Sequence, residues 1–259
     1  MTNSTAAYSS VWSAIGWDGK KTLTSAKLHF ERMQRHSKRL GIVFPDDFID
    51  RFNSLLGEVP IPENRNDNSD QDPYLLVVRV TSNGEVVLSG AVNRQWPLNP
   101  LSGISLNAPS WNDDIRGTKH GDYEPYREAR SIAERNGADI GLLFENGCLI
   151  DGDSCTPLLL DSDGVAYHPP HRDGSLDSVS LQVIKPYLER SGIPVRSARL
   201  TLGMIERSSE MIVCGSGMGI KSLGTIDGRK IGNPKGPLFS ISLEGWSRRT
   251  VSSKFTGSS

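Results

Sequence analysis

The sequence predicts an α+β protein built in two parts, and three observations favour this class. Amphipathic helical patterns precede strand-like runs in the first half, and tight hairpin signals alternate with helical patterns in the second half. Residues 95–114, with three prolines and little periodicity, separate the two halves. We therefore expect a smaller α+β domain over residues 1–114, the connection included, and a larger α+β domain over residues 115–259.

Each element of the first half has a local signal. Residues 25–40, SAKLHFERMQRHSKRL, place an apolar stripe among basic residues and are followed by glycine, which predicts a helix with a C-terminal stop. Residues 46–56 predict a second, shorter helix, and the Pro-, Asn- and Asp-rich residues 59–73 predict a long polar loop. The runs 74–81 and 85–89 flank Ser-Asn-Gly, which predicts an antiparallel hairpin.

The second half predicts two helices and several hairpins. Residues 122–135 indicate a helix with Asp122 as its N-cap, and residues 178–191 indicate an amphipathic helix. Asn-Gly and Asp-Ser-Asp-Gly turns predict two hairpins, whose strands are residues 140–144 with 148–150 and residues 158–160 with 165–167. A buried strand at 211–214 precedes a glycine-rich turn and a further hairpin, and the polar residues 247–259 are expected to fray.

Composition excludes several classes of protein. The 259 residues are 36% hydrophobic and 23% charged, which is typical of a folded domain and too apolar for a disordered chain. The 29 basic residues nearly balance the 30 acidic ones, so no overall charge favours binding to nucleic-acid phosphates. No run approaches the roughly 18 apolar residues of a membrane span, and the opening MTNSTAAYSSVW lacks the basic and apolar regions of a signal peptide.

Cysteine and histidine spacing gives no sign of a disulfide framework or a metal site. Cys148, Cys155 and Cys214 are odd in number and form no CxxC pair, which favours a reducing compartment. His168 and His171 are the only close histidine pair, and no carboxylate or cysteine completes a metal site around them. We therefore expect a soluble, cytoplasmic protein without a metal and without a nucleic-acid or membrane partner.

Five segments, taken in order, resemble the fold-type IV pyridoxal 5'-phosphate enzymes, which include branched-chain aminotransferases, D-amino-acid aminotransferases and aminodeoxychorismate lyase. The segments are DGKKTLTSAKLHFERMQRHSKRLGI, GTKHGDY, GADIGLLFENGCLIDGDS, SLDSVSLQVI and MIVCGSGMGIKSLGTIDGRKIGNPKGP. Each is weak alone, but their order and spacing from about Val11 to Pro237 make the resemblance specific. It implies the two-domain fold-type IV architecture, with pyridoxal phosphate in the interdomain cleft, and a homodimer.

The resemblance also implies roles for individual residues. Lys119 would bind the cofactor as a Schiff base and move the substrate's α-proton. Arg32 would hold the cofactor phosphate with a bidentate guanidinium, and Tyr123 would bond the cofactor's phenolic oxygen. Asp151 stands where the family usually has the glutamate that pairs with the pyridine nitrogen. Further phosphate ligands would lie at a helix start and in the glycine-rich turn: Val179, Ser180, Ser216 and Gly217.

Each of these residues also has a purely structural interpretation. Lys119 could be an exposed loop lysine, Arg32 a charge on a solvated helix face, and Tyr123 a buried aromatic at a helix start. Ser180 could be an N-cap only, and a glycine-rich turn can serve the chain rather than an anion.

The substrate positions depart from the family pattern. Residues 12–17 lack an arginine that many members carry, and Leu76 replaces a second substrate arginine. Arg79 is nearby, but strand alternation points it to the opposite face from Leu76. Trp12 and Lys221 are the candidate substrate contacts.

Three functions stay open. The leading one is a pyridoxal phosphate-dependent class IV aminotransferase that acts on an amino acid and a 2-oxo acid. The second is a lyase that releases pyruvate from aminodeoxychorismate, because Lys119-His120 resembles the lyase branch. The third is a catalytically vestigial cofactor-binding protein, which would suit Asp151 and the unusual Pro157 in a strand.

Overall fold

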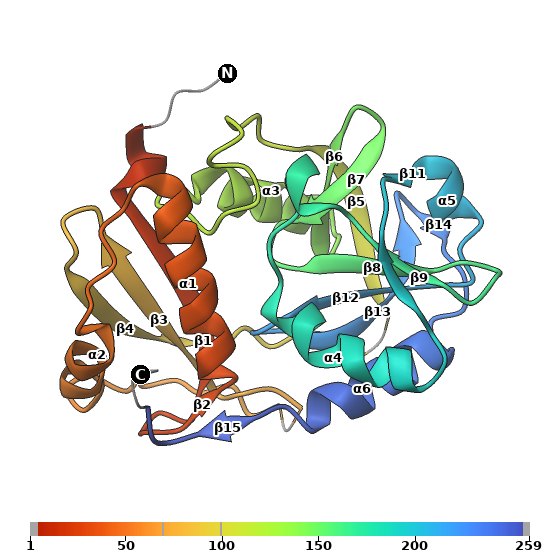
Figure 1. Cartoon of the computed structure of the whole chain (residues 1–259). Coiled ribbons are helices and arrows are strands. Elements are labelled where there is room, and N and C mark those ends of the chain that lie inside the picture. Colours follow the sequence, from red (N-terminus) through yellow and green to blue (C-terminus); the bar gives the residue numbers. More distant parts are fainter. Residues whose placement is uncertain (1–4, 69, 99, 256–259) are drawn as a thin grey trace. The chain divides into compact units, whose positions relative to one another are not determined.

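The computed structural model describes residues 5–68, 70–98 and 100–255, which form two compact units (Figure 1). The smaller unit consists of residues 5–95, Thr118–Tyr123 and 249–255, and the larger unit of Trp96–Gly117 and Glu124–Arg248. This division differs from the expected boundary at residue 114. Residues 96–117 belong to the larger unit because a strand among them pairs inside the larger sheet, and two later segments return to the smaller unit.

The smaller unit is a five-stranded sheet in the order β15-β2-β1-β3-β4. Its long strands are β1 (Ser10–Trp17), β3 (Tyr74–Thr81) and β4 (Val86–Val92), and its short strands are β2 (Leu23–Thr24) and β15 (Val251–Ser252). The β3–β4 hairpin confirms the expected one, and every residue of β1 pairs antiparallel with β3. Burial alternates strictly along β3, so one face of this sheet is apolar.

Two helices complete the smaller unit, after a short 3₁₀ turn at Thr5–Ser9. Helix α1 (Ala26–Leu40) lies along the sheet beside β1, as Figure 1 shows, and ends at Gly41, whose φ of 67° is the left-handed conformation that glycine adopts without strain. Helix α2 (Phe48–Leu56) packs near β4. Phe30 of α1 contacts Phe48 and Phe52 of α2 edge-on, with ring centroids 5.1 and 4.9 Å away, so aromatic packing joins the two helices.

The larger unit is built on a ten-stranded sheet in the order β10-β9-β8-β12-β13-β5-β6-β7-β11, with β14 paired to β13. The strands are β5 (Leu101–Asn107), β6 (Ile140–Glu145), β7 (Cys148–Gly152), β8 (Thr156–Leu160), β9 (Ala166–His168), β10 (Val195–Ser197), β11 (Leu200–Thr201), β12 (Glu210–Gly215), β13 (Gly219–Ile226) and β14 (Arg229–Lys230). The β6–β7, β8–β9 and β13–β14 hairpins are those that the turn residues predict.

Helices cover this sheet, and two apolar clusters stabilise the unit. The helices are α3 (Glu124–Arg135), α4 (Val179–Arg190), α5 (Leu202–Glu206) and α6 (Pro237–Ser247), with a 3₁₀ turn at His171–Asp173. Helices α4 and α6 pack side by side (Figure 1), and one cluster fills the space between them and β12. The other cluster lies on the opposite side of β12, because Val213 belongs to it while Ile212 and Cys214 belong to the first.

Four sequence expectations need correction. The connection 95–114 contains β5, whose flanking prolines hide a strand that pairs parallel to β13 and β6. Helix α3 begins at Glu124, so Asp122 lies two residues before the helix and is not its N-cap. Helix α6 was not expected, and residues 251–252 of the polar end form β15, whereas residues 256–259 lie outside the described part.

Pro157 sits in the interior of the larger sheet, not on an edge strand. Strand β8 lies between β9 and β12, and Pro157 pairs with Val213 of β12. The β9 partner reaches only Leu159 and Leu160, so the proline occupies a part of β8 that is paired on one side.

Neither a membrane span nor a metal cluster is found among the described residues. No helix there has the length and apolar character needed to cross a bilayer. Within the same part of the chain, no three His, Cys, Asp or Glu side chains are grouped so that they could hold a metal ion.

Candidate active site

The backbone of Lys119 is anchored to two elements of the smaller unit. Its carbonyl accepts a hydrogen bond from the Trp12 N–H of β1 at 3.1 Å, and its own N–H donates to Nδ1 of His36 on α1 at 3.0 Å. The next residue, His120, forms a bridge with Val11. These bonds are possible because β2 pairs with β1 only at Trp17, which leaves the other end of that edge of β1 open to the lysine segment.

The Lys119 side chain is seated between two aromatic rings. Its Nζ lies 4.0 Å from the centre of the Trp12 ring and 4.4 Å from that of Tyr123, and it donates a hydrogen bond to the Tyr123 hydroxyl at 3.1 Å. The rings meet edge-on at 4.7 Å, and the indole N–H of Trp12 donates to the His120 carbonyl at 2.8 Å. Three residues selected from the sequence therefore come together, and Lys119 is half-buried rather than an exposed loop lysine.

Arg32 is buried on the inner face of α1, with 3% of its surface exposed, so it is not a charge on a solvated face. Its Nη2 donates to Ser13 Oγ at 2.6 Å and lies 3.5 Å from Nδ1 of His29. Ser13 Oγ is also 2.7 Å from that Nδ1, so its hydroxyl can donate to the imidazole while accepting from the guanidinium. The two neutral partners orient the guanidinium and leave its charge uncompensated by them.

Two buried histidines near Lys119 and Arg32, His29 and His120, are neutral at pH 7. Burial, with the positive charges of Arg32 and Lys119, lowers the pKa of His29 well below its ordinary value. Burial also lowers the pKa of His120 to about 4; Asp122 opposes this shift and Lys119 adds to it. Lys119 and Arg32 are therefore the cations of the cluster.

Sequence reasoning missed His36 and Ser13, and it set Arg79 aside. His29, Arg32 and His36 follow an i, i+3, i+7 spacing, and this signal of a shared helix face is visible in the sequence. Arg79 does face away from Leu76, but it pairs across the sheet with Trp12, so it stands on the face that carries the Lys119 amine. Its Nη1 donates to Ser10 Oγ at 2.5 Å, and this pairing could not be seen without the register of β1 and β3.

The other predicted residues lie in the larger unit, and Asp151 is the buried carboxylate among them. It stands on β7 opposite Leu143, and its Oδ2 accepts a hydrogen bond from the Leu176 N–H at 3.0 Å. Burial, together with the Asp151 charge, raises the pKa of Tyr126. The phenol thus stays protonated close to a carboxylate.

The start of α4 offers groups that suit a phosphate. Ser178 caps the helix by accepting from the Leu181 N–H at 3.3 Å, which leaves the N–H groups of Val179 and Ser180 without a partner inside the helix. Ser180 Oγ is buried and has no hydrogen-bond partner among the described residues. The N-terminus of this twelve-residue helix, with a buried hydroxyl beside it that has no hydrogen-bond partner among the described residues, suits an anionic ligand.

The glycine-rich turn follows the strand next to this helix start. Ser178 Oγ lies 4.0 Å from Cys214 Sγ at the end of β12, and Ser216 and Gly217 come directly after β12 in the β12–β13 turn. The structure thus brings the capped start of α4 close to the strand that leads into this turn. Lys221, the candidate substrate contact on β13, is buried and pairs with Val213 on the apolar inner face of the sheet.

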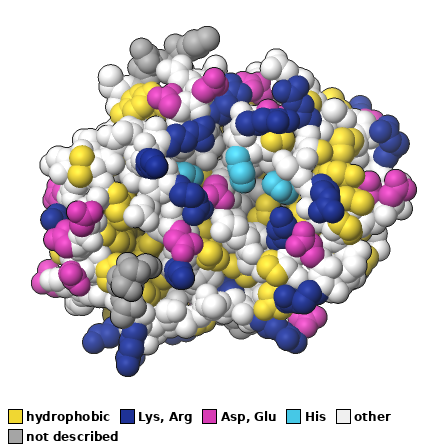
Figure 2. All heavy atoms as spheres, viewed as in Figure 1, with side chains coloured by type: hydrophobic (Ala, Val, Ile, Leu, Met, Phe, Trp, Pro, Cys, Tyr) yellow, Lys and Arg dark blue, Asp and Glu magenta, His cyan; other side chains and the backbone are white. Residues whose placement is uncertain are grey.

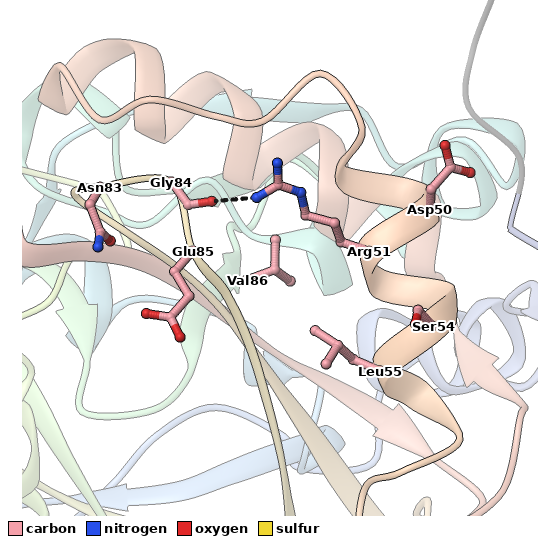
Figure 3. A pocket seen from close by; sticks show the side chains of 8 residues that line it. All are labelled: Asp50, Arg51, Ser54, Leu55, Asn83, Gly84, Glu85 and Val86. Carbon is pink, nitrogen blue, oxygen red and sulfur yellow. Dashed lines mark hydrogen bonds between the residues drawn. The ribbon is translucent and has the colours of Figure 1, made fainter.

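A groove of about 580 Å³ lies elsewhere in the smaller unit and holds none of these residues. Arg51 of α2 donates to the Gly84 carbonyl across it at 3.5 Å, and Asp50, Ser54 and Glu85 also line it (Figure 3). On the molecular face shown in Figure 2, acidic and basic side chains are interspersed, in keeping with the balanced charge.

Comparison with solved structures identifies the fold. A Legionella pneumophila protein provisionally described as a 4-amino-4-deoxychorismate lyase matches with a TM-score of 0.75 and 18% identity over 91% of this chain and 89% of that chain. The branched-chain aminotransferase of Escherichia coli matches with a TM-score of 0.70 and 17% identity over 91% of this chain and 83% of that chain. A Mycobacterium tuberculosis protein described as a hypothetical aminotransferase, in its PLP-bound form, matches with a TM-score of 0.74 and 15% identity, covering 93% and 88%. The fold is that of the fold-type IV enzymes.

The family is shown by the sequence itself. Residues 13–223 match the family described as amino-transferase class IV, which covers most of the chain. No curated protein matches. The chain belongs to the class IV aminotransferase family and is a pyridoxal phosphate-dependent enzyme of the aminotransferase or related lyase type.

Proposed function

We propose that this enzyme is an aminotransferase that moves an amino group between an amino acid and a 2-oxo acid, with Lys119 as its cofactor-binding lysine. The observation that carries the proposal is the seat of Lys119. Its backbone is anchored on both sides, and its amine is held by the Tyr123 hydroxyl over the Trp12 ring. A surface loop lysine does not need these contacts, whereas a nucleophilic amine must be held in a fixed position.

Each residue near the amine has a distinct task in this proposal. When bound, pyridoxal phosphate supplies an electron sink for the negative charge that develops on the substrate Cα. Lys119 would hold the cofactor, and its amine would take and return the proton of that carbon. The Tyr123 hydroxyl, 3.1 Å from Nζ, holds the amine and would bond the cofactor's phenolic oxygen. The Trp12 ring shields one side of the amine from water.

We assign the cofactor's phosphate and ring nitrogen to the residues that the family resemblance implies. Arg32, oriented by Ser13 and His29, binds phosphate oxygens, as do the helix start at Val179 and Ser180. Ser216 and Gly217 add ligands from the β12–β13 turn. Asp151 pairs with the pyridine nitrogen, although its carboxylate reaches one methylene less than the usual glutamate.

We assign the substrate carboxylate to Arg79, and this assignment differs from the sequence expectation. The guanidinium shares a sheet face with Trp12 and so lies on the side of the Lys119 amine. A planar guanidinium binds a carboxylate through two parallel hydrogen bonds. Lys221 stays a second candidate, and Trp12 stays a candidate contact because its ring lies beside the Lys119 amine.

The proposal is tested by borohydride reduction of the purified yellow protein, followed by peptide mapping. A phosphopyridoxyl group is expected on Lys119, and Lys119→Ala should fold, bind the cofactor reversibly and lose turnover. The matched control is Lys230→Ala, which changes an exposed lysine of β14. Modification of any other lysine would overturn the assignment.

Assays with amino donors and 2-oxo acids test the reaction. Arg79→Gln should raise KM for carboxylate substrates more than tenfold, since a charge-assisted hydrogen bond contributes roughly 1.5–3 kcal/mol. An unchanged KM would remove Arg79 from the substrate site.

A lyase acting on aminodeoxychorismate is the second candidate, because Lys119-His120 resembles the lyase branch. Release of pyruvate from that substrate, without any transfer to a 2-oxo acid, would favour the lyase over the aminotransferase. A protein that binds the cofactor and turns over neither class of substrate would be vestigial.

We further propose a cytoplasmic homodimer. The three cysteines are free thiols, in keeping with a reducing compartment. Light scattering should give twice the chain mass of 28.3 kDa, and a monomer mass would count against the dimer.

A further inference from the structure

We infer that His36 is the positioning residue of Lys119: its imidazole holds the lysine backbone so that the amine stays in its seat. The inference rests on the proposed role of Lys119. The contact that carries it is the hydrogen bond from the Lys119 N–H to Nδ1 of His36, at 3.0 Å.

A side-chain acceptor is needed at this point of the chain. Lys119 belongs to no helix or strand, so its N–H has no partner from a regular backbone ladder. A backbone N–H that is taken out of water without an acceptor is costly, and native structures rarely leave one unpaired. His36, with 5% of its surface exposed, comes from the second turn from the end of α1 and supplies the acceptor.

The bond fixes the protonation state of His36. A ring nitrogen that accepts must carry a lone pair, so the imidazole is neutral and its proton sits on Nε2. A cationic imidazole has two donors and cannot accept the lysine N–H. The bond therefore exists only with neutral His36.

The geometry links this bond to the amine. The Lys119 carbonyl is held by Trp12 N–H and its N–H by His36, so the Cα is fixed from both sides. From that Cα, the flexible side chain reaches the Trp12 and Tyr123 rings. Without the His36 bond the backbone at Lys119 is held less firmly, and the amine samples positions from which it cannot reach the reacting carbon.

Two substitutions of His36 distinguish a role in positioning Lys119 from a role in packing alone. In His36→Asn, the Oδ1 oxygen takes the place of Nδ1 and can accept the lysine N–H. In His36→Gln, the side chain has the same polarity, but its acceptor lies one methylene further out. The surface variant Gln34→Asn on the exposed side of α1 is the matched control.

The first measurement is amide hydrogen exchange of Lys119 in the full-length protein without cofactor, read by NMR or by peptides spanning residues 118–123. Exchange should be about tenfold faster in His36→Gln than in the wild type, which corresponds to the loss of one modest hydrogen bond. His36→Asn and Gln34→Asn should exchange like the wild type. Equal exchange in His36→Gln and His36→Asn would overturn the inference.

The second measurement is steady-state kinetics of the cofactor-loaded protein. His36→Gln should lower kcat at least tenfold with little change in KM, because the substrate groups are intact, and His36→Asn should restore most of it. A loss of kcat that asparagine does not restore would show a packing role only. Failure of the proposed function is read separately: a phosphopyridoxyl group on another lysine removes the role of Lys119, whereas the exchange result still reports on the His36 bond.

Discussion

At the scale of single residues, the buried histidines make the stability of the smaller unit depend on pH. His120 has a folded-state pKa of about 4, against about 6.5 in an unfolded chain, because burial penalises its cation. Between these values the unfolded state binds more protons, so stability is complete above pH 6.5 and is lost as pH falls toward 4. The pKa of His29 is lowered as well and contributes with the same sign.

Replacing His120 should flatten this pH dependence. His120→Leu removes the group that must stay neutral. Between pH 6.5 and pH 4 the free energy of unfolding falls in both proteins, and we expect the fall to be smaller in the variant by up to about 3 kcal/mol. Urea titrations at several pH values measure the difference. His29, whose pKa is also lowered, contributes to the slope that remains, and an identical slope in both proteins would show that His120 is not a titrating group in this range.

Arg32 should matter for the cofactor rather than for the helix surface. Arg32→Ala is expected to weaken cofactor binding by roughly 1.5–3 kcal/mol, and Arg32→Lys should recover only part, because an ammonium cannot bind two oxygens in a fork. Arg35→Ala, an exposed arginine three residues further along the same helix, is the control. Equal cofactor affinity in all of these proteins would leave Arg32 with a structural role only.

Residues with a strong local pattern could be selected from the sequence, and residues that depend on register could not. Lys119, Tyr123 and Trp12, which the resemblance singled out, lie together in the structure, and their roles stay predictions. Arg79 was set aside because alternation alone says which face a residue shares with its strand neighbours. Only the pairing of β1 with β3 says which face holds the amine.

At the scale of secondary-structure elements, one buried carboxylate determines how α6 begins. Glu210 of β12 accepts the N–H of Leu238 at 2.9 Å and of Phe239 at 3.0 Å, which satisfies two orphan donors of the first turn. The N-cap residue Gly236 has no side chain that could do this. The helix is thus joined to the sheet by a residue 28 positions away from its partner.

Removing this carboxylate should destabilise the larger unit. Glu210→Ala leaves one buried and one partly buried N–H group unpaired, which should cost about 2–4 kcal/mol of unfolding free energy. Glu244→Ala, on the exposed side of the same helix, should change it by less than about 0.5 kcal/mol. Urea denaturation compares the two, and a similar small cost for both would show that α6 does not depend on Glu210.

The same long-range bond explains why α6 was not predicted from the sequence. Residues 237–247 have no polar N-cap side chain, since the cap comes from another strand. Strand β5 was hidden for a similar reason: prolines flank it, and its parallel partners β13 and β6 come later in the chain. By contrast, α1 and the hairpins β3–β4, β6–β7 and β8–β9 have local stop and turn residues, and these elements were predicted.

At the scale of the whole molecule, the chain leaves the smaller unit and returns to it twice. The first return, Thr118–Tyr123, brings Lys119 to the edge of β1. The second, residues 249–255, pairs β15 with β2 and places Arg249 3.6 Å from Asp72. The smaller unit is therefore completed only after the residues of the larger unit have been made.

Residues 249–255 should therefore stabilise the smaller unit. The Phe255 ring lies 5.3 Å from Phe52 and 6.1 Å from Phe30, and the Phe255 carbonyl accepts from Asn53 Nδ2 at 3.0 Å. Deleting residues 249–259 should lower the Tm by several degrees, because it uncovers the aromatic cluster and frees the edge of β2. Phe255→Ala should lower the Tm less, because losing a half-buried ring costs on the order of 1–2 kcal/mol of unfolding free energy. Lys254→Ala, a change at its exposed neighbour, should leave the Tm almost unchanged. Thermal unfolding measures all three. If the deletion leaves the Tm at the wild-type value, the smaller unit is stable without its final strand, and residues 249–255 are not needed to complete it.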